Sequence, residues 1–172
     1  MAGQGARERA AREASPGFRF EASAADVARV REIVVSTGFF NPEEVGIAVE
    51  LVEARLSSGA ASGYCFVFAE ERGRVQGYTC YGPIAGTAVS FDLYWIAIHR
   101  EAQGRGLGRG LLAETERRVA LVGGRRLYAE TSGRELYALT RAFYERSGYR
   151  REAELRDFYA PGDAKLFYVK VL

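Results

Sequence analysis

Hydrophobic residues recur at helical spacing near the start of the chain. After Ser23, whose side chain can cap a helix, Val27, Val30, Ile33 and Val34 fall on one helical face. This pattern predicts a first helix that begins after Ser23 and buries one side.

A second helix is indicated by the run 41–44, where Asn can cap, Pro suits the first turn, and two Glu face the positive helix end. Its predicted buried stripe consists of Val45, Val49, Val52 and Leu56. The run 57–59 (Ser-Ser-Gly) is expected to end this helix.

Strand-like alternation, broken by Gly and Pro, occupies much of the remaining chain. The predicted strands are residues 17–22, 64–70, 74–81, 89–98, 126–130, 149–158 and 165–171. Two further helices are predicted over 107–121 and 139–146. Antiparallel hairpins followed by a strand–helix–strand unit, with no repeat or linker, predict one α+β (mixed α/β) domain.

Composition narrows the class of protein. The chain has 172 residues, 48% of them hydrophobic, and a net charge of +2 from 24 basic and 22 acidic residues, which argues against a dedicated nucleic-acid binder. No apolar run approaches the ~20 residues of a membrane helix. Cys65 and Cys80 match no metal or redox motif, and His99 is the single histidine, so no metal is expected. Residues 1–16 lack the apolar core of a secretory signal, so we expect an N-terminal arm, either disordered or a short surface helix, before a domain over 17–172. Both cysteines are expected to be core thiols in a reducing cytoplasm.

The stretch 103–110 (QGRGLGRG) follows a predicted strand and opens a helix. Glycines here allow a close backbone approach to a ligand, and amides at the positive helix end suit a phosphate group. Arg105 and Arg109 can add charge-assisted contacts. The pattern predicts a phosphate-binding loop, and the alternative is a tight connection without a ligand.

Two familiar phosphate motifs do not fit this stretch. No Gly-Lys-Ser/Thr follows, so it is not a P-loop. The dinucleotide fingerprint would need Gly or Ala where Arg109 or Leu111 stands. A nucleotide-binding protein is therefore disfavoured.

Three segments occur in a characteristic order: residues 94–99 (YWIAIH), the loop Gln103-x-x-Gly106-x-Gly108, and residues 142–149 (AFYERSGY). Together they resemble the fourth strand, the Q/R-x-x-G-x-G/A loop and the terminal helix motif of the GNAT family of N-acetyltransferases. Arg100 stands where the family often has Pro, and Tyr137 stands near a frequent Asn. The resemblance covers residues 17–171 and implies a mostly antiparallel sheet of about seven strands with about four helices.

The resemblance also implies acetyl-CoA as cosubstrate, without a metal. The backbone of Ile96, Ala97 and Ile98 would pair with the pantetheine arm. The pyrophosphate would bind at the loop formed by Gln103, Gly104, Arg105, Gly106, Leu107, Gly108 and Arg109.

The implied reaction is attack of an amine on the thioester, which needs a proton acceptor and a proton donor. Tyr144 matches the tyrosine that protonates the departing thiolate in many family members. The alternative is a tyrosine that only packs in the core. The neighbouring Phe143 is expected to point into the core. Glu130, predicted at the end of a strand, is the expected base, because burial there could raise its pKa; a surface or salt-bridged glutamate is the equally weighted alternative. Asp92 is a rival base, and its neighbours Phe91, Tyr94 and Trp95 could line an acceptor pocket. His99 is expected to shape the loop.

The acceptor is less constrained by the residues. A small-molecule primary amine is expected, with a protein N-terminus or lysine as runner-up. The third alternative is a non-catalytic CoA-binding regulatory module. We expect no nucleic-acid or membrane partner, and a monomer or homodimer.

Overall fold

The computed structural model describes residues 17–172, so the arm predicted over residues 1–16 lies outside the described part. This part contains four α-helices: α2 (Ala24–Thr37), α3 (Pro42–Ser58), α4 (Leu107–Leu121) and α5 (Ala138–Arg146). Its strands are β1 (Gly17–Arg19), β2 (Cys65–Glu71), β3 (Arg74–Pro83), β4 (Ser90–Ile98), β5 (Arg126–Ser132), β6 (Arg150–Ala160) and β7 (Asp163–Val171). Three short 3₁₀ helices are η1 (Gly59–Ser62), η2 (Arg100–Ala102) and η3 (Glu135–Tyr137).

The strands follow the order β1-β2-β3-β4-β5-β7-β6. The pairs β1–β2, β5–β7 and β6–β7 are antiparallel, and β4–β5 is parallel. The predicted α+β class, with a mostly antiparallel sheet of seven strands and four helices, is confirmed for the described residues. Two compact units are distinguished: the first runs to Cys80 and resumes over Trp95–Leu112, and the second comprises Tyr81–Tyr94 and Ala113–Leu172.

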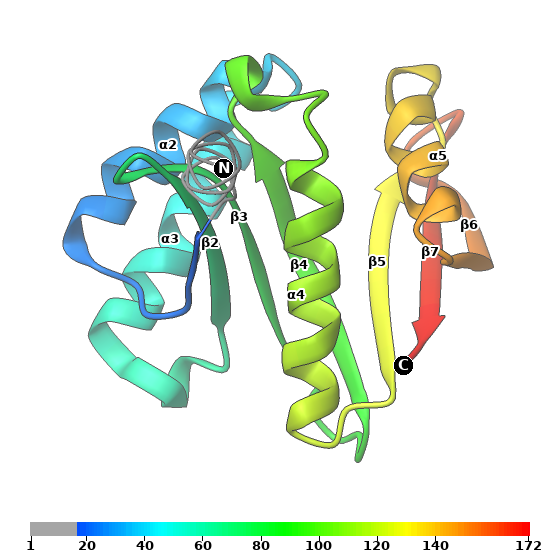
Figure 1. Cartoon of the computed structure of the whole chain (residues 1–172). Helices are drawn as coiled ribbons and strands as arrows, with labels where there is room; N and C mark the ends of the chain where they lie inside the picture. The colour runs from blue at the N-terminus through cyan, green and yellow to red at the C-terminus, as the bar shows by residue number, and fades with distance from the viewer. Residues whose placement is uncertain (1–16) are drawn as a thin grey trace, which may run out of the picture. The chain divides into compact units, whose positions relative to one another are not determined.

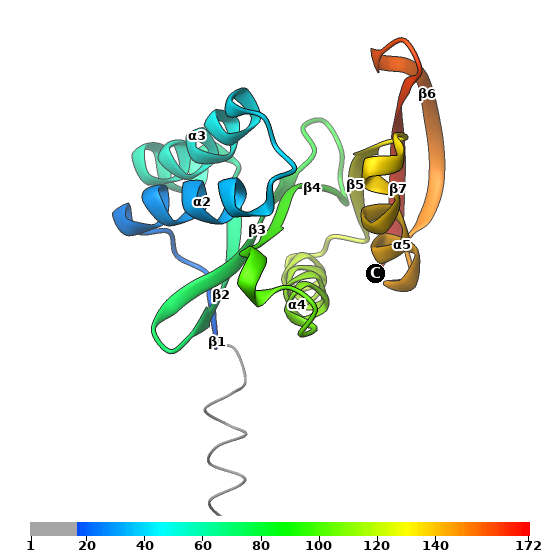
Figure 2. The same cartoon turned by 90° about the horizontal axis from the view of Figure 1, so that it is seen from above.

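In the first unit, α2 and α3 cover one face of β2 and β3 (Figure 2). The helices begin where the capping residues predict: Ser23 and Asp26 form a capping box, as do Asn41 and Glu44. The buried stripe of α3 consists of Val45, Ala48, Val49 and Val52. Leu56, predicted to belong to it, is 41% exposed, because α3 continues beyond its last core residue.

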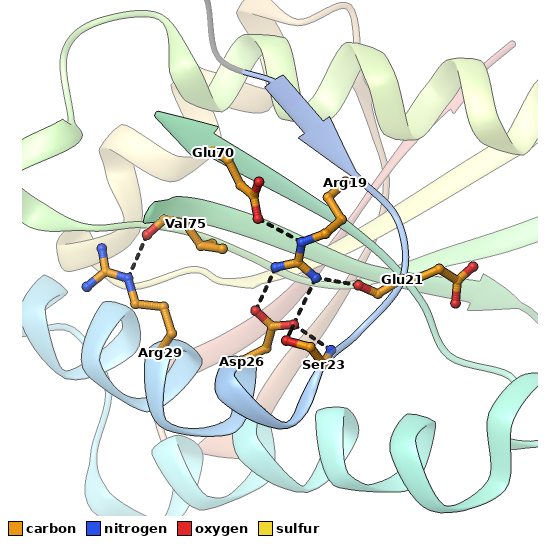
Figure 3. A network of polar contacts seen from close by, with 7 residues as sticks. All are labelled: Arg19, Glu21, Ser23, Asp26, Arg29, Glu70 and Val75. Atoms are coloured by element: carbon orange, nitrogen blue, oxygen red, sulfur yellow. Dashed lines mark hydrogen bonds and ion pairs between the residues drawn. The ribbon is translucent and has the colours of Figure 1, made fainter. Parts of the chain in front are cut away.

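A network around Arg19 ties β1 to α2 and β2 (Figure 3). Its guanidinium donates to both carboxylate oxygens of Asp26, at 2.7 and 2.9 Å, and its Nε donates to Glu70 at 2.7 Å. Asp26 is 2% exposed and also accepts from the Ser23 amide. Burial alone would raise the pKa of Asp26, but the hydrogen bonds from Arg19 and Ser23 hold it below its ordinary value.

In the second unit, β5 and β7 pair in regular register, and α5 packs on one face of them (Figure 1). The side chains on that face include Leu127, Ala129, Leu166 and Tyr168, all at most 4% exposed. Because side chains alternate along a strand, Tyr128, Glu130, Lys165 and Phe167 point to the other face. These four residues are not fully buried, so that face remains partly open.

Candidate functional site

The glycine loop leads from η2 into α4 in the first unit. Gly104 and Gly106 have φ angles of 76° and 83°, a region that costs other residues ~1–2 kcal/mol. The Gly106 carbonyl accepts the first helical bond, from the Gly110 amide at 3.1 Å. Helix geometry therefore leaves the amides of Leu107, Gly108 and Arg109 without acceptors inside the helix.

Open space surrounds the two loop glycines, and the start of α4 is anchored in the core. A Cβ built on Gly104 or Gly106 would meet no atom within 4 Å. Leu107 and Leu111, at 5% and 0% exposure, anchor the helix start in the core. Free amides at the positive end of an anchored helix, beside an open backbone, form an arrangement suited to a phosphate ligand.

Two of the polar side chains of the loop, those of Gln103 and Arg105, have partners within the protein. Arg105 is exposed and pairs with Glu71 at 3.0 Å. The Gln103 amide donates to the Ile98 carbonyl at 3.1 Å, which braces the connection between β4 and the loop. Arg109 is exposed at the helix start. The backbone amides are thus the groups most clearly available to an anion.

The end of β4 carries the residues predicted to meet the pantetheine arm. Ala97 is buried in the core of the first unit, and Ile96 and Ile98 are half-buried. The parallel ladder between β4 and β5 runs from Ser90–Arg126 to Leu93–Ala129. β4 itself continues beyond this ladder to Ile98.

In the second unit, the two candidate bases lie on one face. Asp92 pairs with Tyr128 in the β4–β5 ladder, so its side chain shares a face with Glu130, two residues further along β5. Glu130 forms an ion pair with Lys165 of β7. The structure therefore brings Asp92, Glu130 and Lys165 together.

The two carboxylates differ in their surroundings. Burial raises the pKa of Asp92, the Glu130 carboxylate raises it further, and Lys165 acts in the opposite direction. The side chain of Glu130 is 39% exposed. Of the two readings left open for Glu130, the structure shows the salt-bridged one, with the side chain on the half-open face. The predicted strand end at Glu130 is wrong, because β5 continues to Ser132.

Tyr144 lies within an aromatic cluster on the opposite face. It is 4% exposed, stacks on Tyr168 at 5.8 Å between centroids, and contacts Tyr149 and Phe143 at 5.5 Å. Tyr144 is more buried than Phe143, the residue expected to point into the core. Burial raises the pKa of Tyr144, so its hydroxyl keeps its proton at neutral pH.

Other predicted residues have structural places. His99 caps η2, accepting from the Glu101 amide at 3.4 Å, which confirms its predicted part in shaping the loop. Trp95 packs on Phe40 with centroids 4.9 Å apart. Phe91 pairs with Leu127 in the β4–β5 ladder, so its side chain lies on the Leu127 face of the sheet, away from Asp92. The aromatic residues around Asp92 therefore do not form one wall.

Lys165 is the residue that sequence reasoning missed. It lies 35 positions from Glu130, and only the β5–β7 register reveals their contact. A weak signal existed in composition, because Lys165 and Lys170 are the only lysines among 24 basic residues. Their positions on opposite faces of β7 could not be assigned to partners without the sheet.

Comparison with known proteins identifies the family. A model described as Acetyltransferase (GNAT) domain matches residues 62–151. The structure of a protein from Desulfovibrio desulfuricans assigned to the GNAT family is 51% identical, with a TM-score of 0.90, covering 91% of this chain and 99% of that one. A search of curated proteins returned no match.

More distant structures share the fold. The protein yncA from Salmonella typhimurium, solved with its cofactor acetyl-CoA, is 20% identical at a TM-score of 0.70, covering 92% of this chain and 95% of that one. The aminoglycoside 6'-N-acetyltransferase from Enterococcus faecium is 18% identical at a TM-score of 0.70, covering 89% and 96%. In the described residues, no helix combines the length and apolar character needed to cross a membrane. With a matching family model over half its length and a relative at 51% identity, the chain belongs to the GNAT family of N-acetyltransferases.

Proposed function

We propose that this acetyltransferase moves an acetyl group from acetyl-CoA to the primary amine of a small molecule, by direct attack of the amine on the thioester. The observation that supports this most is the start of α4, where positive-φ glycines expose helix amides beside open space. The pyrophosphate of CoA is the anion proposed to bind there, at residues 103–109, and membership of the GNAT family supports this proposal.

The pantetheine arm is proposed to pair with the backbone of Ile96–Ile98. This part of β4 lies beyond its ladder with β5, which ends at Leu93. Ala97 points into the core, so the strand itself is held rigidly. The proposed contact uses backbone groups and needs no side chain. The presence of Arg100 and Tyr137, where the family often has Pro and Asn, therefore does not weaken this part of the proposal.

The proposed chemistry needs two proton transfers. The carboxylates of Glu130 and Asp92 are the candidate acceptors for the proton of the amine. Nitrogen then bonds to the acetyl carbon as the carbon–sulfur bond breaks, and the Tyr144 hydroxyl donates its proton to the thiolate. Solvent restores the tyrosine proton after CoA leaves.

The acceptor class is supported by the half-open face of the second unit. Two carboxylates and one lysine give Asp92, Glu130 and Lys165 a net charge of −1 when all are ionised, which suits a cationic amine. The aminoglycoside acetyltransferases of the same fold, by their names, act on amine-bearing small molecules. Ribosomal-protein-alanine acetyltransferases share the fold as well, and they support the alternative of a protein N-terminus.

An acetylation screen tests this proposal. The chain is incubated with acetyl-CoA and, separately, with putrescine, spermidine, lysine methyl ester, kanamycin and a hexapeptide with N-terminal alanine. We expect thiol release and a mass gain of one acetyl group with at least one small amine. Acetylation of the peptide alone would move the acceptor to polypeptides, and tight CoA binding without any transfer would favour a non-catalytic CoA-binding module.

A further inference from the structure

The face of the second unit that carries Asp92 contains a compact charged cluster. Asp92, Tyr128 and Glu130 share this face through the β4–β5 register. Phe167 pairs with Glu130, and Lys165 lies two residues before Phe167 on the same face of β7. Three adjacent strands thus place two carboxylates and one ammonium group side by side.

Lys165 is held more firmly than a surface lysine. Its side chain is 15% exposed, and its ammonium group forms an ion pair with Glu130. The same group lies 4.7 Å from the ring centroid of Phe158 and 5.1 Å from that of Phe167. Cation–π contacts and the ion pair together fix the ammonium group, and with it the Glu130 carboxylate.

Unlike Lys165, Asp92 is not held by a partner among the described residues. It is half-buried, and in the part of the chain that the structure describes no ion pair or hydrogen bond engages its carboxylate. The charged groups that face it are Glu130 from β5 and Lys165 from β7. The Asp92 carboxylate has both oxygens available to accept a proton from an incoming ammonium group, whereas one oxygen of Glu130 is engaged by Lys165.

We propose that Asp92 accepts the proton of the acceptor amine, and that Lys165 is a positioning residue that holds Glu130 as its ion-pair partner. This inference rests on the proposed acetyl transfer. One nitrogen–hydrogen bond of the ammonium group breaks, its proton moves to the Asp92 carboxylate and from there to water, and the freed electron pair attacks the thioester carbon. As the carbon–sulfur bond breaks, the Asp92 carboxylate accepts a second proton from the nitrogen, which leaves the neutral amide, and returns this proton to water.

The charge relation can be measured without knowing the acceptor. Aspartate labelled with ¹³C at its side-chain carboxyl gives a readable spectrum, because the chain has four aspartates: Asp26, Asp92, Asp157 and Asp163. Asp92→Asn identifies the Asp92 signal, and a pH titration of the full chain then gives its pKa. We expect a pKa above the ordinary value, lower in Glu130→Gln and higher in Lys165→Met.

Two control variants test whether the lysine effect is specific. Lys165→Arg keeps the charge and should leave the titration near that of the wild type. Lys170 also forms an ion pair with a glutamate, Glu116 at 2.6 Å, and lies 5.7 Å from the Tyr149 ring, but on the other face of β7. Lys170→Met should therefore leave the Asp92 titration unchanged. An ordinary pKa for Asp92, or one that neither Glu130→Gln nor Lys165→Met moves, overturns the proposal.

Kinetics with the best acceptor of the amine panel distinguishes the two carboxylates. Asp92→Asn should lower kcat/KM by about 100-fold, whereas Glu130→Gln should keep the acid limb of the pH profile and move it to lower pH. If Glu130→Gln abolished the acid limb and Asp92→Asn only moved it, the assignment would be overturned. Failure of the wild type to acetylate any amine would instead contradict the proposed function, while the titrations still decide the charge relation.

Discussion

Tyr144 and Glu130 lie on opposite faces of the sheet formed by β5 and β7. Tyr144 stacks on Tyr168, which pairs with Ala129, whereas Glu130 pairs with Phe167 and contacts Lys165. Asp92 lies on the Glu130 face. The proposed proton donor and the candidate proton acceptors therefore lie on opposite faces, so the proposed reaction requires a thioester that both faces can reach, and each group can be altered without touching the other.

Removal of the Tyr144 hydroxyl tests its part as proton donor. Tyr144→Phe keeps the ring and its stacking on Tyr168, so folding and the apparent affinity for acetyl-CoA should change little. We expect kcat to fall by about 10- to 1000-fold, the smaller loss applying if water substitutes as acid. Because burial raises the pKa of Tyr144, the loss should be the same factor across the accessible pH range. Steady-state rates from pH 6 to 9 measure it.

The neighbouring Tyr149 supplies the control for this variant. Its ring lies 5.5 Å from that of Tyr144 in the same cluster, and it is 2% exposed. Tyr149→Phe should leave kcat near that of the wild type. Equal rates in wild type and Tyr144→Phe, with chemistry limiting, would assign Tyr144 to packing alone, as would a loss of folding.

A methyl group at Gly106 tests the anion site at the start of α4. Gly106→Ala places a Cβ where φ is 83° and no protein atom lies within 4 Å. The protein without ligand should therefore lose only the ~1–2 kcal/mol of stability that backbone strain costs. A bound pyrophosphate would meet this methyl group. We expect CoA affinity, measured by calorimetry, to fall by about 10-fold or more, equivalent to ~1.4 kcal/mol.

Gly123 offers the matched control, because its φ is 85° and its Cβ position is equally open. Gly123→Ala should cost a similar amount of stability and leave CoA affinity unchanged. Equal affinity losses in both variants would show that strain, and not contact with the ligand, weakens binding.

The ion pair of Asp26 with Arg19 should make stability depend on pH. Asp26 has a lowered pKa in the folded state, so its contribution is complete above the unfolded pKa of ~3.9 and is lost as the pH falls through the folded value. Asp26→Asn should lower the free energy of unfolding by about 2 kcal/mol at pH 7, because the buried side chain at position 26 loses the negative charge that strengthens its hydrogen bonds from Arg19. Urea unfolding should show this difference shrinking below about pH 4.

An exposed ion pair on β6 provides the comparison for that series. Arg151 pairs with Glu154 at 3.4 Å, and their side chains are 57% and 40% exposed. Glu154→Gln should change the free energy of unfolding by less than about 0.5 kcal/mol at pH 7. If Asp26→Asn lowered the free energy of unfolding by no more than this, or by the same amount at pH 3 as at pH 7, the Arg19–Asp26 ion pair would not contribute as predicted.

Much of the fold could be predicted because its signals are local. The start of α2 at Ser23 and that of α3 at Asn41 follow from capping residues within four positions. The predicted bounds of α4, 107–121, are those observed, since the glycine loop and the apolar stripe both lie within one segment. The strand predicted to break at 82–83 instead continues through Gly82 to Pro83.

The arrangement of the carboxylates could not be predicted, because it depends on strand register. Asp92, Glu130 and Lys165 come from three strands, and their common face follows from pairings between distant segments. The sequence pattern predicted that the strand ends at Glu130, whereas β5 continues to Ser132. Glu130 therefore lies within the β5–β7 ladder, where it contacts Lys165. The loop glycines, by contrast, were recognisable because consecutive residues build the whole anion site.

The central claim, that Gln103–Arg109 binds the pyrophosphate of acetyl-CoA, is tested most directly by calorimetry with CoA, ATP and NAD on the wild-type chain and on Gly106→Ala. We predict saturable CoA binding by the wild type, weaker binding by Gly106→Ala, and much weaker binding of ATP and NAD than of CoA. Tight binding of ATP or NAD without binding of CoA would contradict the account.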